Sequence, residues 1–391
     1  MSPPWLIVGG GIHGVHIAVR LIAEAGCDPD GVRILDPADE LLARWRACAA
    51  ATGMTHLRSP AVHQLDLEPF SLHEFAANAE HRRSDLFAPP YERPSLDLFN
   101  EHCDQVIETY GVDALHIRGA AASCRVDCQR VTVDTRDGGS LTAANVVFAI
   151  GVGEQPHWPD WAPSGDPCVE HVFAHGFVFP STGGGGEVAV VGGGISAAQV
   201  ALRLVQDGCR VQLVSRHPLR QHQFDSDPGW LGPKRMAGFA RETDLARRRA
   251  VITEARHRGS VPPDVLKALQ KAIQDGRIEW QVADVTDVID EQGARRLQLS
   301  NGRELLVERV LLATGFAPRR PGGSMVDELI ESASLPCAAC GYPIVDSALR
   351  WHPRVYVSGA LAELELGPSA RNIAGARRAG ERIANAARLV A

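Results

Sequence analysis

The stretch WLIVGGGIHGVHIA at residues 5–18 predicts a strand, a tight turn and a helix, and the rest of the chain can be arranged around it. Four apolar residues lead into the pattern GxGxxG, formed by Gly9, Gly11 and Gly14, and apolar residues then recur at helical spacing. Gly9 allows the sharp turn, Gly11 leaves room for a pyrophosphate, and Gly14 lets the helix pack closely on the strand. The helix N-terminus then offers free N–H groups and a partial positive charge to phosphates.

A second apolar strand follows the predicted helix and ends in an acidic residue. Residues 32–35 read VRIL, and Asp36 comes 22 positions after Gly14. An acid at about this spacing accepts a hydrogen bond from a ribose hydroxyl of a dinucleotide. Because GxGxxG alone is common, a glycine-rich turn that binds nothing is the alternative. With strand, helix and acid in place, the sequence favours a dinucleotide site.

Length and composition limit the class of protein. A chain of 391 residues is long enough for two or three domains, and 45% hydrophobic and 22% charged residues are typical of a globular protein. The net charge of −7 gives no reason to expect a nucleic acid or an anionic membrane as partner. No apolar run is long enough to span a bilayer, and the first strand begins too close to Met1 for a signal peptide, so we expect a cytoplasmic protein.

The glycine run at 183–186 precedes a second copy of the opening pattern. Residues 187–191 read EVAVV, and GxGxxA follows with Gly192, Gly194 and Ala197 before a helix that continues to Gln206. Two such units in one chain are far more specific than one. The residues expected to contact the second nucleotide at this turn are Gly192, Gly194, Ile195 and Ser196.

The ends of the two second strands differ in charge. Residues 211–214 run into Ser215 and Arg216, with Arg220 just beyond, where the first unit has Asp36. A hydroxyl and arginines suit a 2′-phosphate, whereas an acid suits a 2′-hydroxyl. The first site is therefore predicted to bind FAD and the second NADPH. Solvated surface charge is the alternative for the two arginines.

The remaining segments suggest an insertion. A buried strand at 146–151 is followed by the proline-rich QPHWP at 155–159, which marks a boundary. A strand at 309–316, ending at Gly315, is expected to return to the first domain as a partner of 148–151. We predict an α/β fold of two Rossmann-like, three-layer β/β/α domains, with the NADPH domain inserted in the FAD domain. The predicted ranges are 1–165 and 309–391 for the FAD domain and 183–308 for the NADPH domain.

The C-terminal region completes the first domain. The last strand, at 355–360, carries Gly359 and Ala360, and a helix is predicted from about Ala370 to Arg388. Pro368 and Ser369 precede this helix as a cap and anion site.

The chain thus has two glycine-rich units, an Ala-Thr-Gly strand end at 313–315 and a final strand–glycine–helix. With these features it resembles the two-dinucleotide-binding-domain flavoproteins over its whole length. Within that superfamily the chain is most similar to the flavin-dependent N-hydroxylating monooxygenases, the lysine and ornithine N-hydroxylases of siderophore synthesis. The matching stretches are MTHLRS at 54–59, where that family runs along the flavin ring, FDSDPGW at 224–230, and the arginine-rich segment 248–261.

Two departures from that family leave the substrate open. The family's substrate-holding lysine is Arg58 here, and its Asn-Tyr-Ser reads Arg258-Gly259-Ser260. The FxGxxxHxxx[WY] signature of Baeyer–Villiger and related monooxygenases has no clean match; the nearest stretch is EHVFAH at 170–175.

The resemblance implies a reaction and a set of residues. NADPH would reduce FAD, and O2 bound as a C4a-(hydro)peroxyflavin would hydroxylate a nitrogen of a small amine or amino-acid-like metabolite. Arg58, His63 and Asp225 are the candidate catalytic residues; a structural ion pair, an ordinary buried histidine and a turn role are their respective alternatives. The further flavin contacts expected are Trp45, His56, Leu57, Arg58 and Ser59. No metal is expected, and a homo-oligomer is compatible with the sequence.

Two rival functions stay open. Cys337 and Cys340 form the only CxxC among nine cysteines and could relay electrons to a disulfide, as in an NADPH-dependent flavoprotein disulfide reductase. They lie between Gly315 and the last strand, where such flavoproteins usually carry a surface hairpin. A zinc site would need a second CxxC. The other rival is a non-catalytic module that merely holds the cofactors.

Overall fold

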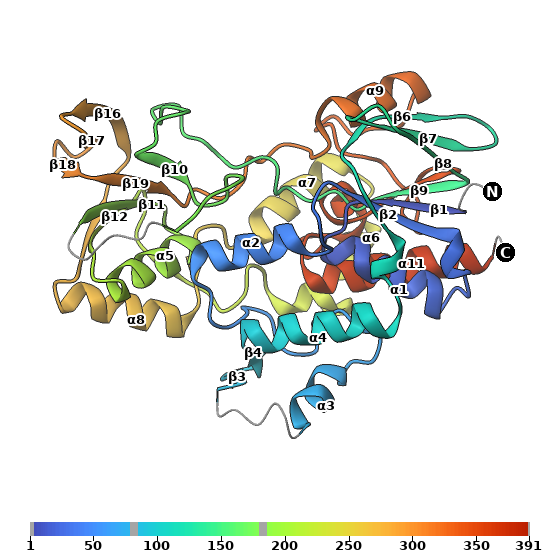
Figure 1. The fold of residues 1–391 in the computed structure, drawn as a ribbon, viewed down its shortest axis with the longest axis horizontal. Helices are drawn as coiled ribbons and strands as arrows, with labels where there is room; N and C mark the ends of the chain where they lie inside the picture. Colours follow the sequence, from blue (N-terminus) through green and yellow to red (C-terminus); the bar gives the residue numbers. More distant parts are fainter. Residues whose placement is uncertain (1–3, 79–84, 180–185, 390–391) are drawn as a thin grey trace.

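The structure, a computed structural model, describes residues 4–78, 85–179 and 186–389. It has two lobes, each built on a mainly parallel sheet (Figure 1). The glycine run predicted at 183–186 lies, apart from Gly186, outside the described residues, as does the predicted boundary at residue 183.

The sheet of the first lobe has six strands in the order β20-β21-β9-β1-β2-β5. Neighbouring strands are parallel except β20 and β21, which are antiparallel. The strands are β1 (Trp5–Val8), β2 (Val32–Asp36), β5 (His116–Arg118), β9 (Asn145–Phe148), β20 (Arg350–His352) and β21 (Val355–Val357).

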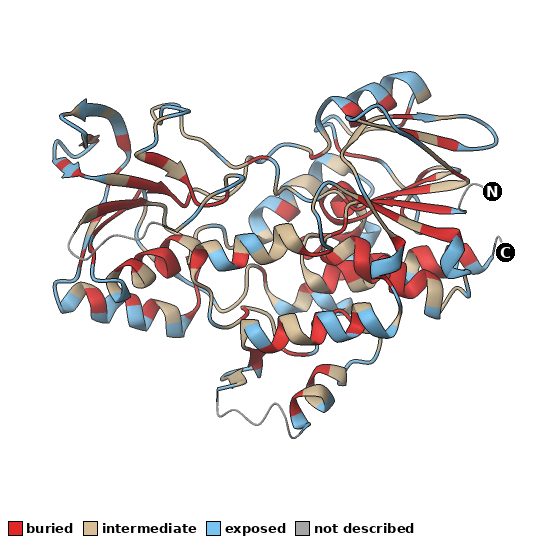
Figure 2. Cartoon of the chain, in the orientation of Figure 1, coloured by how far each residue is buried: buried red, intermediate tan, exposed pale blue. Residues whose placement is uncertain are grey.

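The alternation of side chains in β1 divides the first lobe into three layers. Trp5 and Ile7 pack against helices α1, α4 and α11, whereas Leu6 and Val8 pack against α9 and a three-stranded meander. Buried residues follow the sheet and the inner faces of α1 and α11 (Figure 2). These covering elements are α1 (Ile12–Ala23), α4 (Leu96–Thr109), α9 (Gly323–Ala333), α11 (Ile373–Arg388), β6 (Ala121–Val126), β7 (Val131–Thr135) and β8 (Ser140–Ala143).

The second lobe repeats this β/β/α arrangement on five parallel strands in the order β10-β19-β11-β12-β15. One face packs on α5 and α8 and the other on a second meander. The elements are β10 (Val169–His171), β11 (Glu187–Val191), β12 (Arg210–Ser215), β15 (Ile278–Val282), β19 (Arg309–Leu312), α5 (Ile195–Gln206), α8 (Pro263–Gln274), β16 (Val285–Glu291), β17 (Ala294–Leu299) and β18 (Glu304–Val307). The predicted fold class is confirmed in both lobes.

The remaining elements of the described chain lie outside these two sheets and the layers that cover them. They are α2 (Ala43–Thr52), α3 (Ser71–Ala77), β3 (Phe87–Ala88), β4 (Arg93–Pro94), β13 (Arg220–Gln221), α6 (Pro233–Arg241), α7 (Leu245–Ala255), β14 (Ser260–Val261), α10 (Glu363–Leu366) and the 3₁₀ turns Pro29–Gly31, Asp113–Leu115, Pro228–Leu231 and Gly359–Ala362. None of the helices in the described ranges combines the length and apolar character that crossing a bilayer requires.

The strand predicted at 309–316 does not return to the first domain. It forms β19, which pairs with β11 and β10 in the second sheet, so the prediction is wrong and the second lobe extends past residue 308. The strand that pairs with β9 on this side is β21 instead. Both strands are short, apolar and followed by a glycine, so local sequence did not distinguish which sheet each one joins.

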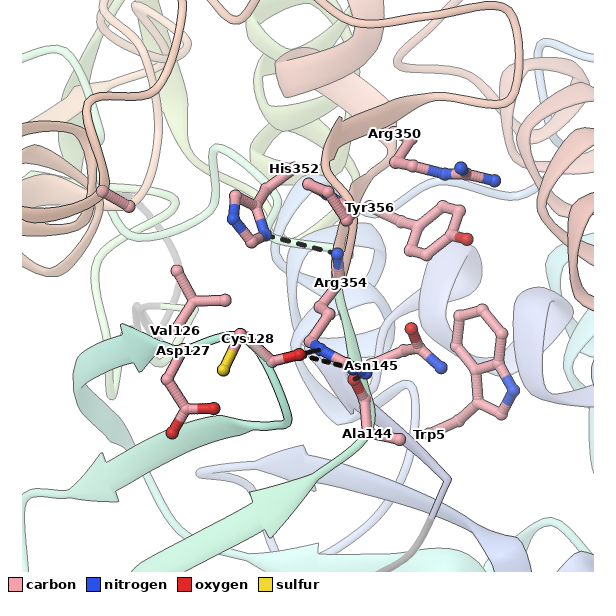
Figure 3. A pocket seen from close by; sticks show the side chains of 12 residues that line it. Trp5, Val126, Asp127, Cys128, Ala144, Asn145, Arg350, His352, Arg354 and Tyr356 are labelled. Atoms are coloured by element: carbon pink, nitrogen blue, oxygen red, sulfur yellow. Dashed lines mark hydrogen bonds between the residues drawn. The ribbon is translucent and has the colours of Figure 1, made fainter. Parts of the chain in front are cut away.

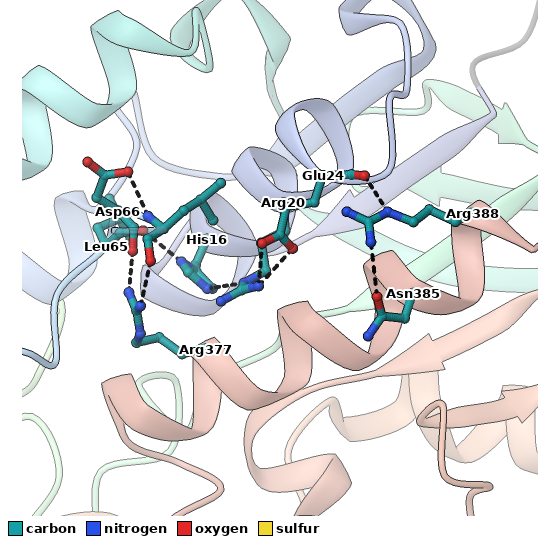
Figure 4. Close-up of polar contacts among 9 residues, drawn as sticks. His16, Arg20, Glu24, Leu65, Asp66, Arg377, Asn385 and Arg388 are labelled. Atoms are coloured by element: carbon teal, nitrogen blue, oxygen red, sulfur yellow. Dashed lines mark hydrogen bonds and ion pairs between the residues drawn. The ribbon is translucent and has the colours of Figure 1, made fainter. Parts of the chain in front are cut away.

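Helices α1 and α11 lie side by side, and polar side chains of both hold the loop at residues 64–67 (Figure 4). His16 accepts a hydrogen bond from Arg20 at Nε2 (2.8 Å), so its Nδ1 carries the proton and donates to the Leu65 carbonyl (2.6 Å). From α11, Arg377 donates to the Leu67 carbonyl at 2.9 Å. Burial lowers the pKa of His16 to about 3, which keeps its ring neutral.

Arginines also join the two lobes. Arg93, which is 2% exposed, pairs with Asp264 of α8 at 2.7 Å, and Arg203 of α5 donates to the Ala50 carbonyl at the end of α2 (2.9 Å). Arg58 makes a third link, described below. Since these contacts are directional, they hold one relative placement of the two glycine turns.

Candidate functional site

The first glycine turn has the close approaches that its pattern predicts. Gly9 has φ of +114°, and a Cβ there would lie 2.6 Å from the Ala149 carbonyl oxygen. A Cβ on Gly14 would lie 1.8 Å from the Gly9 oxygen, whereas one on Gly11 would meet no atom within 4 Å. The turn is therefore tight where the chain packs on itself and open at Gly11, at the start of α1, where no side chain caps the helix. This cradle fits a pyrophosphate.

Asp36 stands beside this turn. Its carboxylate accepts hydrogen bonds from the Gly10 N–H (2.6 Å) and the Ala38 N–H (3.0 Å), one at each oxygen. Each oxygen keeps a lone pair that a ribose hydroxyl could use. The acid thus fixes the turn and remains able to bind a nucleotide.

The second glycine turn is built in the same way but has less room. Gly192 has φ of +153°, and its Cβ would lie 2.5 Å from the Ala313 oxygen. A Cβ on Gly194, which precedes Ile195 and Ser196 of α5, would lie 3.4 Å from Cα of Gly259. The segment around Gly259, where the N-hydroxylases have Asn-Tyr-Ser, therefore faces this turn.

The residues predicted to bind a 2′-phosphate differ in burial and in whether they are already hydrogen-bonded. The Ser215 hydroxyl is buried, donates to the His217 carbonyl and accepts from Trp280 Nε1, both at 2.9 Å, so the protein already uses it. Arg216 and Arg220 are exposed, and within the described ranges neither guanidinium has a hydrogen bond or ion pair. Arg258, beside Gly259, is a third exposed cation here that was not predicted to bind the phosphate.

Arg58 lies between the lobes. Its Nε donates to the Gln223 carbonyl (2.7 Å), and Nη2 donates to the His222 carbonyl (2.8 Å) and to Ser260 Oγ (2.9 Å). Burial lowers the pKa of Arg58, and the nearby Asp225 opposes this shift. With these bonds Arg58 acts as a bridge, which favours the structural alternative to the predicted catalytic role.

Asp225 is brought to the start of α11 from the second lobe. Its Oδ1 accepts from Asn372 Nδ2 at 3.2 Å, and Oδ2 lies 3.9 Å from the Arg256 guanidinium. The turn role expected as its alternative belongs instead to Asp227, whose carboxylate accepts from the Gly229 N–H at 2.7 Å. Asp225, Arg58 and Arg256 thus form a charged group with two cations and one anion.

His63 is separate from this charged group. It is half-buried in the loop that α11 holds through Arg377, and burial, followed by the charge of Arg377, lowers its pKa. His56 contacts the Asp85 carbonyl through Nε2 at 2.9 Å, beside a cavity of about 250 Å³. Within the described residues, His63 makes no hydrogen bond or ion pair with Arg58 or Asp225, and the catalytic roles of the three residues remain predictions.

The other predicted flavin contacts differ in exposure. Leu57 is buried in the core of the first lobe, and Trp45 packs on Phe99 with ring centroids 5.1 Å apart. Ser59 is half-buried next to Arg58. Their contact with a flavin remains a prediction.

Near the C-terminus, one expectation needs correction. Helix α11 begins at Ile373 with Asn372 at the N-cap position, so Pro368 and Ser369 do not cap it. Both are buried, and Ser369 Oγ accepts a long hydrogen bond from Arg378 (3.4 Å). Asn372 was missed because serine and asparagine are about equally favoured at an N-cap, so the local sequence did not distinguish Ser369 from Asn372.

Gly359 and Ala360 form a 3₁₀ turn after β21. A Cβ on Gly359, which has φ of +62°, would lie 3.6 Å from the ring of His13 in the first glycine turn. The His13 ring contacts Ser358 Oγ at 2.7 Å, and burial lowers its pKa to about 4. The turn at 359–360 therefore adjoins the first nucleotide cradle, and Gly315 (φ of +78°) follows β19 in the second lobe.

The structure also reveals a polar side chain without partners. Both amide atoms of Gln223 are buried, and neither has a hydrogen-bond partner within residues 4–78, 85–179 and 186–389. A buried amide without partners costs about 1–3 kcal/mol per group, which a bound molecule could offset. Gln223 was missed because only tertiary packing creates this situation.

The larger cavity lies elsewhere. It measures about 710 Å³ and is lined by residues at the amino ends of β1, β9 and β21, including Trp5, Asn145 and Arg354 (Figure 3). The first glycine turn follows the carboxyl end of β1, at the opposite end of these strands, and the second glycine turn follows β11 in the other sheet. We therefore do not assign this cavity to either nucleotide.

Comparison with known proteins places the chain in a family. The family model for pyridine nucleotide-disulphide oxidoreductase matches residues 71–387, and no curated protein sequence gives a significant match. The fold is similar to that of the ornithine N-hydroxylase KtzI of Kutzneria sp. 744, with a TM-score of 0.80, 18% identity and 100% of both chains covered.

Two further solved structures share the fold. The cadaverine monooxygenase DfoA of Erwinia amylovora has a TM-score of 0.72 at 15% identity, covering 97% of this chain and 93% of that one. The bacillithiol disulfide reductase Bdr of Bacillus cereus has a TM-score of 0.64 at 17% identity, covering 100% of both chains. The match to the family model spans most of the sequence, and the chain belongs to the pyridine nucleotide-disulphide oxidoreductase family.

Proposed function

We propose that the protein is an FAD- and NADPH-dependent monooxygenase that hydroxylates a nitrogen of a small amine or amino-acid-like metabolite. The observation that carries this proposal is the fold agreement with an ornithine N-hydroxylase over the whole chain, at a TM-score of 0.80. The structure of that protein is described as containing reduced FAD, NADP+ and L-ornithine. O2 is the proposed co-substrate, and we expect the enzyme to act in the cytoplasm.

The two cofactors are assigned to the two glycine turns. FAD would lie on the first turn, with Gly11 at its pyrophosphate, Asp36 at its ribose and the 359–360 turn alongside. NADPH would lie on the second turn, with Arg216 and Arg220 at its 2′-phosphate. Bound FAD would supply the redox chemistry, accepting a hydride from NADPH and reacting with O2. We propose that the NADPH lobe is inserted between the two parts of the FAD lobe.

The substrate is assigned to the region where the lobes meet at the start of α11. The Gln223 amide offers a donor and an acceptor that the protein does not use. Arg58 and Arg256 outnumber Asp225 there, which suits a substrate or cofactor group with negative charge. The protein's part in the reaction is to hold these groups in place and to exclude water.

Oxygen transfer is the direct test. The flavin-loaded enzyme is mixed with NADPH and ornithine, lysine or cadaverine in ¹⁸O₂, and the products are analysed by mass spectrometry. We expect amine-dependent NADPH oxidation and a product carrying one labelled oxygen atom. NADPH oxidation that yields no labelled product with any amine would contradict the proposal.

The disulfide reductase remains the second candidate, because the family and the Bdr fold include that activity. A disulfide reductase would use NADPH to reduce a low-molecular-weight disulfide, and it would do so in the absence of O2. An anaerobic assay with such disulfides separates the two functions. Flavin that NADPH cannot reduce would instead indicate a module that only holds cofactors.

A further inference from the structure

The CxxC sequence lies on a tight turn between α9 and β20. The Gly341 N–H donates to the Ala338 carbonyl (2.8 Å), and the Ala338 N–H donates to the Tyr342 carbonyl (2.9 Å). The backbones of Cys337 and Pro343 form an isolated antiparallel β-bridge. The turn places Ala338 opposite Gly341, so Cys337 lies just before the turn and Cys340 lies within it. Neither cysteine is in a disulfide, and the charge of Cys340 contributes to raising the pKa of Cys337.

The two thiols of this turn have different surroundings. Cys340 is exposed, whereas Cys337 is partly buried, and burial is the main reason that its pKa is raised. An oxidant from solution would therefore reach Cys340 first. Cys337 is placed to react second, with the modified sulfur of its neighbour.

A half-buried cation adjoins the exposed thiol. Arg249 of α7 forms an ion pair with Glu363 and lies 3.9 Å above the Tyr342 ring. Burial by itself would lower the pKa of Arg249, but Glu363 and, more weakly, Cys340 raise it. Its Nε and Nη2 are buried, and no hydrogen-bond partner for them lies in the described part of the chain. Negative charge on the Cys340 sulfur would supply the missing acceptor.

The turn is also linked to the start of α11. Glu363, which is 1% exposed, holds Arg371 at 2.8 Å as well as Arg249, and Arg371 precedes Asn372 at the N-cap of α11. A small core that includes Tyr342 packs the turn against α6, α7 and α10. A change in the turn would thus act on the ion pairs near the proposed substrate region.

We propose that Cys337 and Cys340 form a dithiol that a hydroperoxide oxidises to a disulfide. The Cys340 thiolate attacks the peroxide, forming an S–O bond and breaking the O–O bond, and hydroxide leaves and takes a proton. The Cys337 sulfur then attacks the Cys340 sulfur, forming the S–S bond, and the S–O bond breaks as water leaves with the thiol proton. Two thiols are oxidised, and hydrogen peroxide is reduced to water.

The test uses the full-length, flavin-loaded protein with hydrogen peroxide, followed by alkylation of free thiols and peptide mass mapping. We expect an intramolecular disulfide between Cys337 and Cys340, while Cys128, another exposed thiol, remains alkylatable. In Cys337→Ser, oxidation should stop at a sulfenic acid on Cys340, which dimedone captures. Cys340→Ser should leave Cys337 reduced.

Two arginine variants test the role of the cation. Arg249→Gln should slow oxidation of Cys340 about tenfold, because it removes a charged hydrogen-bond donor that would stabilise the anionic sulfur. Arg247→Gln, on the same helix with a side chain 75% exposed, should leave the rate unchanged.

Three outcomes would overturn the proposal. The first is that Cys340 is oxidised no faster than Cys128. The second is that Cys337→Ser gives no dimedone adduct. The third is that the two thiols hold a stoichiometric amount of zinc. If Arg249→Gln does not fold, the comparison of Cys340→Ser with Cys128→Ser decides, because only the former should protect Cys337.

Discussion

Replacement of Arg58 distinguishes a bridge between the lobes from a catalytic group. Its guanidinium donates to the His222 and Gln223 carbonyls and to the Ser260 hydroxyl, at 2.7 to 2.9 Å. Hydrogen bonds from a charged donor contribute about 1.5–3 kcal/mol each, but bonds within one network do not add fully. We therefore expect Arg58→Ala to lower the free energy of unfolding by about 3 kcal/mol, and Arg58→Lys, which keeps the charge but not the fork of donors, by about 1–2 kcal/mol.

Urea denaturation followed by circular dichroism measures these changes in the flavin-free and flavin-loaded protein. Arg118→Ala is the control: the ion pair of Arg118 with Asp39 is exposed, with side chains 70% and 75% accessible. We expect this control to change stability by less than about 0.5 kcal/mol. If Arg58→Ala leaves the free energy of unfolding within that margin but abolishes turnover, Arg58 acts in the chemistry and the bridge argument is refuted.

Three further predictions concern the glycine turns, the second nucleotide and pH. Gly14→Ala should destabilise the apoprotein and prevent flavin retention, because the added Cβ would lie 1.8 Å from a carbonyl oxygen of the turn. Gly11→Ala, whose Cβ would meet no atom within 4 Å, should keep apoprotein stability and lose only flavin affinity. Equal stability of the two apoproteins would contradict this difference between the two glycines. Arg216→Gln combined with Arg220→Gln should raise KM for NADPH about tenfold or more and leave KM for NADH unchanged, and parallel changes in both KM values would contradict the 2′-phosphate assignment. Burial lowers the pKa of His16 to about 3 from 6.5. The unfolded chain therefore binds a proton at His16 that the native state does not, and His16 alone should lower stability below pH 6.5 by about 1.4 kcal/mol per pH unit. His16→Gln should show a correspondingly smaller pH slope in urea denaturation, and an unchanged slope would refute this origin.

The features predicted correctly from sequence are those that depend on neighbouring residues. The turns at Gly9 and Gly192 have the positive φ angles and close backbone approaches that their patterns indicate. These constraints act over a few residues, because a glycine is required wherever a Cβ would meet the chain. The β/β/α layers follow from the alternation of side chains, as in β1.

The errors occur where a pattern fits more than one place. β19 resembles a strand of either sheet, and its pairing with β11 depends on contacts with residues more than a hundred positions away. Similarly, α11 was predicted to start at about Ala370 with Pro368 and Ser369 as its cap, whereas it starts at Ile373 with Asn372 at the N-cap position. Local propensity cannot choose between such alternatives because tertiary packing decides them.

The sequence by itself determined two nucleotide-binding units, their order and the charge that follows each second strand, since glycine sterics and strand–helix periodicity are local properties. Only the tertiary structure decided which groups Arg58 and Asp225 contact, and it alone placed Arg249 beside Glu363 and Cys340. The physical reason is that desolvation, charge and hydrogen-bond satisfaction depend on what packs around a side chain, and in this protein those neighbours come from distant parts of the chain.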